Sequence, residues 1–389
     1  MSIYKCLFTS LLLASLFCKP VHADEPLAQK YPGWKSVLKK LQACIDSASV
    51  KGVDQRYVEI PKKPWQIAVR GNINQSELKM KSFINSNAYA ENAHGTLEWE
   101  PRIRTDITTY TGVWVGYRGY GIGMAKNIGG DKGSLMTLGA VSGKYSLNLR
   151  IHHFETDDPV VNFTGQIEND ETGEVDMFDD TQHFMLYQPL KVKTVMFDGI
   201  YFFNSHKFSN LAAYDQSTIQ RRSAGSPIAG CMIYYSKVNY DTPLNNDLIF
   251  FMNNIGRIKQ WQASVGAGYA YNWVIGKNLM LNATVMPMLS FYNRLKVYTY
   301  DSYLLQEVLY GDDNDEIDDP DNWWIKPSGT KKVNGKVKLN YDARMSLTYN
   351  LKDWFFNVNG QFCNFRYKHA SSKGRLNDWY VNASVGIRL

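Results

Sequence analysis

The sequence predicts an all-β protein, namely a transmembrane antiparallel β-barrel of about 12 strands, in a range of roughly 10–14, with a short N-terminal helix. Three observations support this prediction. Long segments alternate apolar and polar residues with a period of two, the last segment does so up to the final residue, and the chain begins with a short apolar stretch typical of exported proteins.

Residues 1–23 have the pattern of a signal peptide. Lys5 supplies the charged start, and Leu7–Phe17 is an apolar stretch too short to span a bilayer. Val21-His22-Ala23 resembles a cleavage site, which predicts export and a mature chain that begins at Asp24. Cys18 leaves lipidation open as an alternative, although a bulky Phe17 before it fits lipoprotein processing poorly.

Residues 24–62 are predicted to form a separate N-terminal segment. Apolar residues recur there at helical spacing, as Trp34, Val37, Leu38, Leu41 and Ile45. Two interpretations remain open: a periplasmic helix that packs on the barrel mouth, or a plug that enters the lumen. Residues 63–389 are then the barrel.

Lys336–Asn350 shows the two-residue alternation most clearly, and Ala263–Ile275 repeats it. In a barrel strand the polar face lines the lumen and the apolar face contacts lipid. The predicted lumen-lining residues are Lys336, Lys338, Asn340, Asp342 and Arg344. The predicted lipid-facing aromatic girdle consists of Tyr341, Tyr349, Tyr269, Trp273 and Trp379.

The spacing of two tyrosines favours lipid over a soluble core. Tyr341 and Tyr349 share the apolar face and lie roughly 26 Å apart along an extended strand. A strand tilt of about 40° reduces this to about 20 Å of height, close to the apolar band between two aromatic girdles.

Thirteen segments fit a strand pattern: 65–74, 77–86, 93–100, 108–118, 120–128, 143–155, 190–204, 224–238, 259–275, 279–297, 335–350, 354–369 and 376–389. Single-chain bacterial barrels have even strand numbers, so about 12 is the predicted number. The long segments 156–189 and 298–334 are then expected outside the cell, and the turn at 350–353 on the periplasmic side.

The segment Trp379–Leu389 is predicted to be the closing strand. Its odd positions are apolar and its even positions are polar or small. Such a C-terminal strand is what a barrel needs for closure and insertion, so the predicted partners are the barrel-assembly machinery and the lipids and lipopolysaccharide of the outer membrane.

The net charge and the cysteine content argue against a nucleic-acid-binding protein, a disulfide-rich scaffold and a cysteine metal site. A net charge of +6 and a pI of about 8.8 are too mild to indicate nucleic-acid binding. Cys44, Cys231 and Cys363 are too few and too widely spaced for a disulfide scaffold or a metal site. No cofactor is predicted.

A set of motifs resembles an uncharacterised outer-membrane family of Bacteroidetes, the domain-of-unknown-function family 4421. The motifs are Tyr201-Phe202-Phe203-Asn204, Lys207-Phe208-Ser209, Ala212-Ala213-Tyr214, Gln220-Arg221-Arg222-Ser223-Ala224-Gly225-Ser226, Arg118-Gly119-Tyr120-Gly121 and Glu98-Trp99-Glu100-Pro101. Asn210-Leu211 departs from the aromatic-proline pair expected there. The resemblance covers roughly 55–389 and implies an outer-membrane barrel, but it implies no reaction and no catalytic residues.

Candidate chemistry is sparse. His369 and Ser371 lie two residues apart and could pair as base and nucleophile, but no third group orients them, so no enzyme is predicted. The acidic loop between Asp312 and Asp321 is predicted to be solvated, with divalent-cation binding as the alternative.

Arg221 and Arg222 are predicted either to contact lipopolysaccharide phosphates or to be an ordinary strand-end pair.

Three functions remain open. Passage or binding of a small or lipidic solute is favoured because the polar faces would line a lumen. A structural or surface-interaction barrel is the second, and an outer-membrane lipid-modifying enzyme that uses His369 and Ser371 is the third.

Overall fold

The computed structural model describes residues 42–43, 45–47, 52–90, 93–104, 107–130, 132–157, 160–169, 172–183, 186, 188–251, 254–304, 323–369 and 372–389. These residues form a closed antiparallel barrel with 12 strands in its wall. In chain order the wall strands are β2 (Trp65–Ala90), β4 (Thr108–Tyr117), β5 (Tyr120–Gly129), β6 (Gly133–Val141), β7 (Tyr145–Thr156), β10 (Leu190–Phe202), β12 (Ala224–Asn239), β13 (Ile255–Val274), β14 (Leu279–Leu304), β16 (Lys338–Leu351), β17 (Trp354–His369) and β18 (Ser372–Arg388).

The barrel closes between its first and last strands. Val69 on β2 lies opposite Val385 on β18, and Ile73 lies opposite Val381. The predicted fold class is therefore confirmed, including the strand number.

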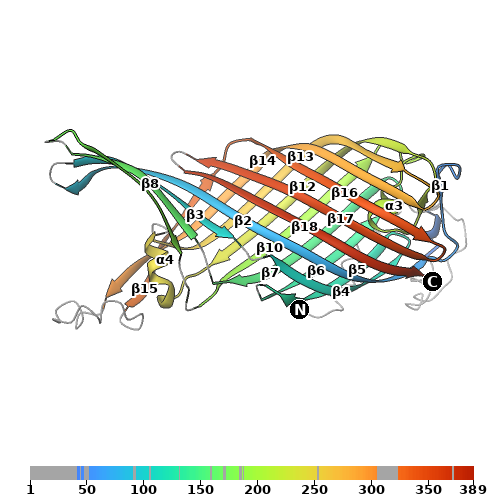
Figure 1. The fold of residues 1–389 in the computed structure, drawn as a ribbon, viewed down its shortest axis with the longest axis horizontal. Helices are drawn as coiled ribbons and strands as arrows, with labels where there is room; N and C mark the ends of the chain where they lie inside the picture. The colour runs from blue at the N-terminus through green and yellow to red at the C-terminus, as the bar shows by residue number, and fades with distance from the viewer. Residues whose placement is uncertain are drawn as a thin grey trace, which may run out of the picture.

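The two ends of the barrel differ (Figure 1). At one end, called here the long-loop end, β2 extends to pair with β3 (Ala93–Arg104). There β3 pairs with β8 (Val160–Asn169), and β8 pairs with β9 (Val175–His183). At the same end β15 (Trp323–Asn334) pairs with the extension of β14, and η1 (Pro243–Asn245) and α4 (Asn246–Phe251) connect β12 to β13.

At the opposite end, called here the short-turn end, tight turns join neighbouring strands. Arg118 and Gly119 form the two-residue turn between β4 and β5, with φ values of 50° and 95°. Positive φ at both central residues matches the right-handed twist of a hairpin, and glycine adopts it without strain. One connection at this end is long: residues 203–223 contain α3 (Asn210–Tyr214) and β11 (Ile219–Gln220), which pairs with β1 (Val58–Glu59).

Three of the predicted segments differ from the observed strands. Segments 65–74 and 77–86 are one continuous strand, β2, and segment 93–100 belongs to β3, outside the barrel wall. The sequence prediction missed β6 because Gly133–Val141 is built mostly of apolar and small residues, so its two faces show no polar contrast.

The faces of the strands are reversed relative to a soluble protein. On β16, Asn340, Asp342 and Ser346 are buried inside the barrel, whereas Met345 and Leu347 on the outer face are 59% and 43% exposed. A surface of this kind is stable when lipid covers it, since an exposed apolar band is unfavourable in water. Among the described residues, no helix is both long and apolar enough to cross a membrane.

Candidate functional site in the barrel lumen

The connection between β10 and β12 lies inside the barrel at the short-turn end. We call residues 203–223 the plug. Ser209 caps α3 by accepting a hydrogen bond from the Ala212 backbone N–H, and residues 210–213 are buried. Buried backbone carbonyls need partners, and here the lumen-facing side chains of the wall supply them. The carbonyl oxygens of Ser209, Ala212, Ala213 and Gln216 accept hydrogen bonds from Asn272, Thr348, Asn357 and Arg388, respectively.

Gln220 ties the plug together. Its amide nitrogen donates to the carbonyl oxygens of Lys207 and Arg222, at 2.6 and 2.9 Å, and its amide oxygen accepts from the Ser209 backbone N–H. The same oxygen accepts a hydrogen bond from Asn272 on β13. One buried amide therefore joins both ends of the plug to the barrel wall.

Residues that precede β2 in the chain also contact the plug. β1 pairs with β11, and Arg221 donates to the Glu59 carboxylate. The Arg56 guanidinium donates to both carboxylate oxygens of Asp54 and holds the pKa of that carboxyl at about 2. The plug thus contacts residues 52–59 as well as the wall.

The described part of the N-terminal helix lies at the rim. Gln42 and Asp46 hydrogen-bond the Tyr117 hydroxyl, and Asp46 lies 3.5 Å from Arg118 in the β4–β5 turn. Tyr117 occupies an outward position on β4, since Trp114 and Gly116 are the buried, lumen-facing residues there. Trp34, Val37, Leu38 and Leu41 lie outside the described residues. In the described structure the lumen at this end holds the plug.

A cavity of about 120 Å³ lies in the lumen next to the plug. Three guanidinium groups, from Arg70, Arg150 and Arg344, and two carboxylates, from Asp198 and Asp215, line it. Two further buried carboxylates lie just behind this lining, Asp342 beside Arg344 and Asp378 beside Arg150. Tyr214 from the plug and Tyr380 from β18 also line the cavity.

Arg344 is fully paired. It extends from β16 across the lumen to Asp198 on β10, at 3.1 Å, and it also contacts Asp342 two residues away on its own strand, at 2.7 Å. Asn148 and Gln361 donate further hydrogen bonds to these two carboxylates. Two carboxylates and their amide partners thus pair one buried guanidinium and connect two wall strands that are not neighbours.

Arg150 is not fully paired. It is 8% exposed, and neither of its terminal nitrogens has a hydrogen-bond partner. The nearest carboxylate, Asp378, is 3.8 Å away, and the Tyr380 ring lies 4.3 Å from the guanidinium carbon. Arg70 likewise lies over an aromatic ring, with its guanidinium carbon 4.0 Å from the centre of Trp114. The cavity therefore contains unsatisfied cationic donors.

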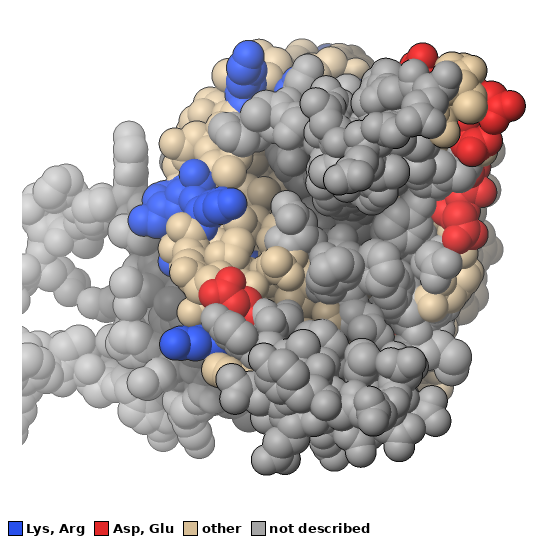
Figure 2. Space-filling view, turned by 90° about the vertical axis from the view of Figure 1, so that its left-hand side faces the viewer, with Lys and Arg blue, Asp and Glu red and all other residues tan. Residues whose placement is uncertain are grey.

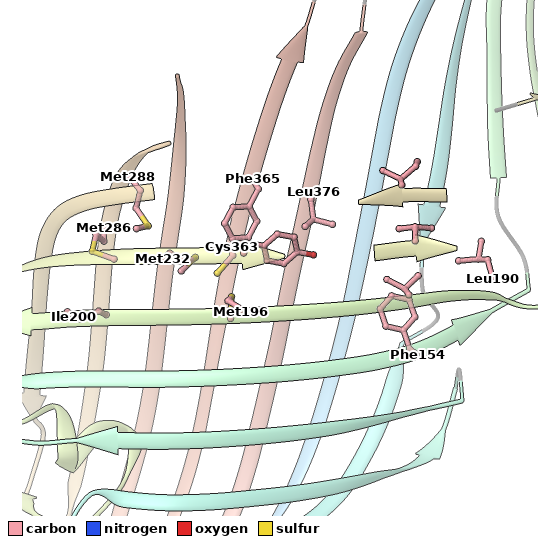
Figure 3. Close-up of a cluster of buried hydrophobic side chains, with 14 of the residues drawn as sticks. Phe154, Leu190, Met196, Ile200, Met232, Met286, Met288, Cys363, Phe365 and Leu376 are labelled. Atoms are coloured by element: carbon pink, nitrogen blue, oxygen red, sulfur yellow. The ribbon is translucent and has the colours of Figure 1, made fainter. Parts of the chain in front are cut away.

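An apolar cluster fills the lumen on the long-loop side of this cavity (Figure 3). Met196, Met232, Met286 and Met288 come from three strands, β10, β12 and β14. Tyr234 on β12 and Phe365 on β17 stack with their ring centroids 4.6 Å apart. Methionine side chains adapt their shape readily, so this part of the lumen can be repacked at low cost.

The structure places most of the predicted lumen residues inside the barrel. Asn340, Asp342 and Arg344 are buried there, Lys338 is half-buried at the start of β16, and Lys336 is exposed just before that strand. The aromatic residues predicted to face lipid point outward: Tyr341 and Tyr349 are 40% exposed, Tyr269 52% and Trp273 44%, while the half-buried Trp379 pairs with the outward Phe362.

The sequence analysis did not single out Arg70, Arg150 or Asp198 as site residues. Each is a charged residue at a lumen-facing position of a long alternating strand, and that pattern could have identified them. It could not show that they meet, because they lie on β2, β7 and β10.

The two arginines predicted as a possible lipopolysaccharide contact lie outside the lumen cavity. Arg221 and Arg222 lie at the short-turn end, where Arg221 pairs with Glu59 and Arg222 lies 5.8 Å from the Tyr57 ring. Both arginines therefore lie at the end of the barrel opposite to the long loops. Lipopolysaccharide contact by these arginines stays an untested prediction.

The histidine and acidic candidates do not form a site among the described residues. His152 is buried and hydrogen-bonded to the Tyr110 hydroxyl at 2.9 Å, whereas His153 faces the other side of β7. The His369 side chain, Ser371 and the acidic loop from Asp312 to Asp321 lie outside the described residues. No cluster of three or more metal-binding side chains occurs in the described part of the chain.

Comparison with known proteins bears on fold and family. The translocator domain of the autotransporter NalP from Neisseria meningitidis is 6% identical, with a TM-score of 0.30, and the match covers 92% of this chain and 99% of that one. The outer membrane protease OmpT from Escherichia coli is 10% identical, with a TM-score of 0.28 and coverage of 85% and 98%. The toluene transporter TodX from P. putida is 8% identical, with a TM-score of 0.24 and coverage of 85% and 91%. At these values the likeness concerns the barrel fold alone.

No curated protein shows significant similarity to the sequence. A protein family described as Domain of unknown function (DUF4421) matches residues 53–388. That range contains the whole barrel, the plug and β1, so the chain belongs to the DUF4421 family.

Proposed function

We propose that this barrel lies in the outer membrane and binds a small solute that combines an apolar part with an anionic group, for gated passage through the lumen. The apolar outer surface supports the membrane location, and the outward tyrosines and tryptophans suit the two interfaces of a bilayer. The lumen supports the solute class, because it places an adaptable apolar cluster next to a cavity in which the Arg150 guanidinium has terminal nitrogens without hydrogen-bond partners.

The Arg150 guanidinium carries the proposal, because neither of its terminal nitrogens has a hydrogen-bond partner. Leaving buried donors without partners costs roughly 1–3 kcal/mol or more for a charged group, so a structure keeps them where a ligand supplies the partner. A carboxylate or phosphate accepts two parallel N–H bonds from a guanidinium, and the terminal nitrogens of Arg150 are available for this. Arg70 lines the same cavity and adds a second positive charge.

The cavity volume limits what it can hold. A cavity of about 120 Å³ is smaller than an engineered cavity of about 150 Å³ that binds benzene, so it can hold a carboxylate but not a long alkyl chain as well. The apolar part of the solute would occupy space now filled by the methionine side chains. Binding in this position therefore requires the apolar cluster to repack.

Passage requires a further rearrangement. The plug occupies the short-turn end, and the Arg344–Asp198 pair crosses the lumen beside the cavity. A solute that moves along the lumen would have to displace both the plug and this ion pair. The same features favour the second candidate function, a barrel that does not transport and whose filled lumen only stabilises it.

A binding experiment separates the two functions. The full chain in lipid nanodiscs is titrated calorimetrically with octanoate, with octanol as the apolar control and acetate as the anionic control. We expect octanoate to bind and the Arg150→Gln variant to bind it at least tenfold more weakly. The matched control is Arg56→Gln, which removes an exposed guanidinium outside the lumen.

Two results would contradict the proposal. Equal binding of octanoate by the native chain and Arg150→Gln would exclude the anion site. Absence of octanoate binding, together with no octanoate flux into protein-containing liposomes, would favour the structural barrel instead.

A further inference from the structure

Five lysines form one row near the long-loop end, across four wall strands and the adjoining β15. Lys193 on β10 lies opposite Lys237 on β12, which lies opposite Lys259 on β13. Lys259 lies opposite Lys296 on β14, and Lys296 lies opposite Lys332 on β15. The register of five consecutive strands therefore aligns five positive charges that are far apart in the sequence.

All five positions face away from the lumen. Their strand neighbours Val192, Val238, Ile258 and Val297 are buried on the lumen side, at 3–8% exposure. Side chains alternate between the faces of a strand, so Lys193, Lys237, Lys259 and Lys296 project outward, and Lys332 shares their face because it pairs with Lys296.

Such a row is unfavourable without a counter-charge. Directly opposed residues on neighbouring strands have Cβ atoms about 4.5–5.5 Å apart, where like charges destabilise the pair. Among the described residues, no carboxylate forms an ion pair with any of the five lysines. Lys259 instead donates to the Tyr298 hydroxyl at 2.9 Å, and the Lys296 ammonium lies 4.5 Å from the same ring.

An aromatic pair lies next to Lys237 and Lys259, on the membrane side. Tyr235 on β12 and Trp261 on β13 are paired, with their ring centroids 4.5 Å apart, and Trp261 is 47% exposed. The outward residues below them, such as Ile233 and Val265, are apolar and 44–48% exposed. Tryptophan and tyrosine occupy the membrane–water interface, so Lys237 and Lys259, two residues away on the same strands, lie at the level of the lipid headgroups. The row runs obliquely from there, because barrel strands are tilted.

Charge is also distributed unevenly around this end. Figure 2 shows the Lys and Arg side chains mainly on one side of the long-loop end, with one acidic group among them, and the other Asp and Glu side chains on the opposite side. A lipid leaflet with anionic headgroups would thus meet a basic sector and an acidic sector on the same barrel.

We propose that the lysine row (Lys193, Lys237, Lys259, Lys296 and Lys332) binds the phosphate groups of a phosphorylated glycolipid in the leaflet at the long-loop end. The apolar and aromatic surface beneath the row contacts the acyl chains of the same molecule. The lysines carry the phosphate contact because ammonium groups act as mobile point charges that suit phosphates on a fluid surface. This assignment is independent of what the lumen binds.

The test uses the full chain purified in a neutral detergent, with bis-phosphorylated lipid A as the probe. Dephosphorylated lipid A and inorganic phosphate form the comparison arms. The test variant is Lys237→Gln/Lys259→Gln/Lys296→Gln. The matched control is Lys62→Gln/Lys277→Gln/Lys352→Gln, which removes three exposed lysines at the short-turn end.

We expect the native chain and the control to retain lipid A in native mass spectrometry, and the test variant to bind it roughly 100-fold more weakly, since three charges near the surface are removed. Lipid A should raise the unfolding temperature of the native chain. Without lipid, the test variant should unfold at the same or a higher temperature, because the repulsion between lysines is relieved. This last readout shows that the variant is folded.

Other outcomes would overturn the proposal. Retention of lipid A by the test variant at native affinity would show that the row does not bind it. Equal binding of dephosphorylated lipid A would exclude the phosphate as the recognised group. Binding of inorganic phosphate that displaces lipid A would assign the row to a soluble anion instead of a lipid.

Discussion

The Tyr234 ring on β12 stacks on the Phe365 ring on β17 at a centroid distance of 4.6 Å and an interplanar angle of 26°. These strands are not neighbours, because β13, β14 and β16 lie between them in the barrel wall. The two rings therefore meet across the lumen, as Arg344 and Asp198 do nearer the plug. Two contacts of different chemistry thus brace the barrel from inside.

Removal of one ring should destabilise the barrel. Phe365→Ala leaves a cavity at a position that is 2% exposed, and we expect a loss of about 3 kcal/mol or more in the free energy of unfolding. The measurement is urea unfolding in detergent, followed by tryptophan fluorescence. Phe362→Ala is the matched control on the outer face of the same strand, at 42% exposure, and it should cost less because detergent covers the site. Equal losses would argue against the cross-lumen brace.

Arg344 should be strongly coupled to Asp198 and Asp342 in the free energy of unfolding. Arg344→Met leaves Asp198 and Asp342 buried without their counter-charge, which typically costs about 3–5 kcal/mol. Asp198→Asn in the same chain should recover part of that loss, because only one unpaired carboxylate then remains. A double-mutant cycle on unfolding free energies measures the coupling, and additive effects would contradict a direct pair.

Charges on the outer face of β18 should block insertion. Val385 is 44% exposed on that face, and Ile387 lies two positions further along the same side. We expect Val385→Asp/Ile387→Asp to prevent membrane insertion, because arginine or lysine on the lipid face costs about 2–4 kcal/mol near mid-membrane and aspartate somewhat less. Heat-modifiable migration in electrophoresis reports the folded barrel. Asn382→Asp, on the lumen face, is the control and should insert normally.

The turn between β4 and β5 should require glycine. Gly119 has φ +95°, and a Cβ added there would meet the Val141 carbonyl oxygen at 2.1 Å. Gly119→Ala should therefore destabilise the barrel by about 1–3 kcal/mol, the usual cost of a strained backbone position. Gly276→Ala is the matched control in the turn between β13 and β14, because nothing lies within 4 Å of its added Cβ. Unfolding free energies within error of each other would show that the turn tolerates a side chain.

The sequence motifs shared with the family acquire a physical explanation from the structure. Arg118 and Gly119 form the tight turn, and the Arg118 guanidinium donates to the Pro61 carbonyl oxygen at 2.8 Å. The motifs between Tyr201 and Ser226 comprise the plug and its junctions with β10 and β12. The departure at Asn210-Leu211 falls in the first turn of α3, where both residues are buried.

The sequence by itself determined the fold class and the faces of the strands. Alternation with a period of two is a local property, so Asp342 and Arg344 could be placed on one face and Tyr341 on the other without knowledge of the fold. The alternation did not predict β6, where both faces are apolar or small. It also divided β2 in two, because that strand runs from the wall into the long-loop extension.

Only the tertiary structure decided what fills the lumen and what lies on the surface near the long loops. Which residues meet across the lumen depends on barrel closure, and the lysine row depends on the register of five strands. The sequence analysis placed the plug hypothesis on residues 24–62, whereas the described lumen holds residues 203–223. Hydrogen bonds from lumen-facing Asn272, Asn357 and Arg388 to backbone carbonyls hold that connection, and such contacts over long sequence distances leave no local pattern.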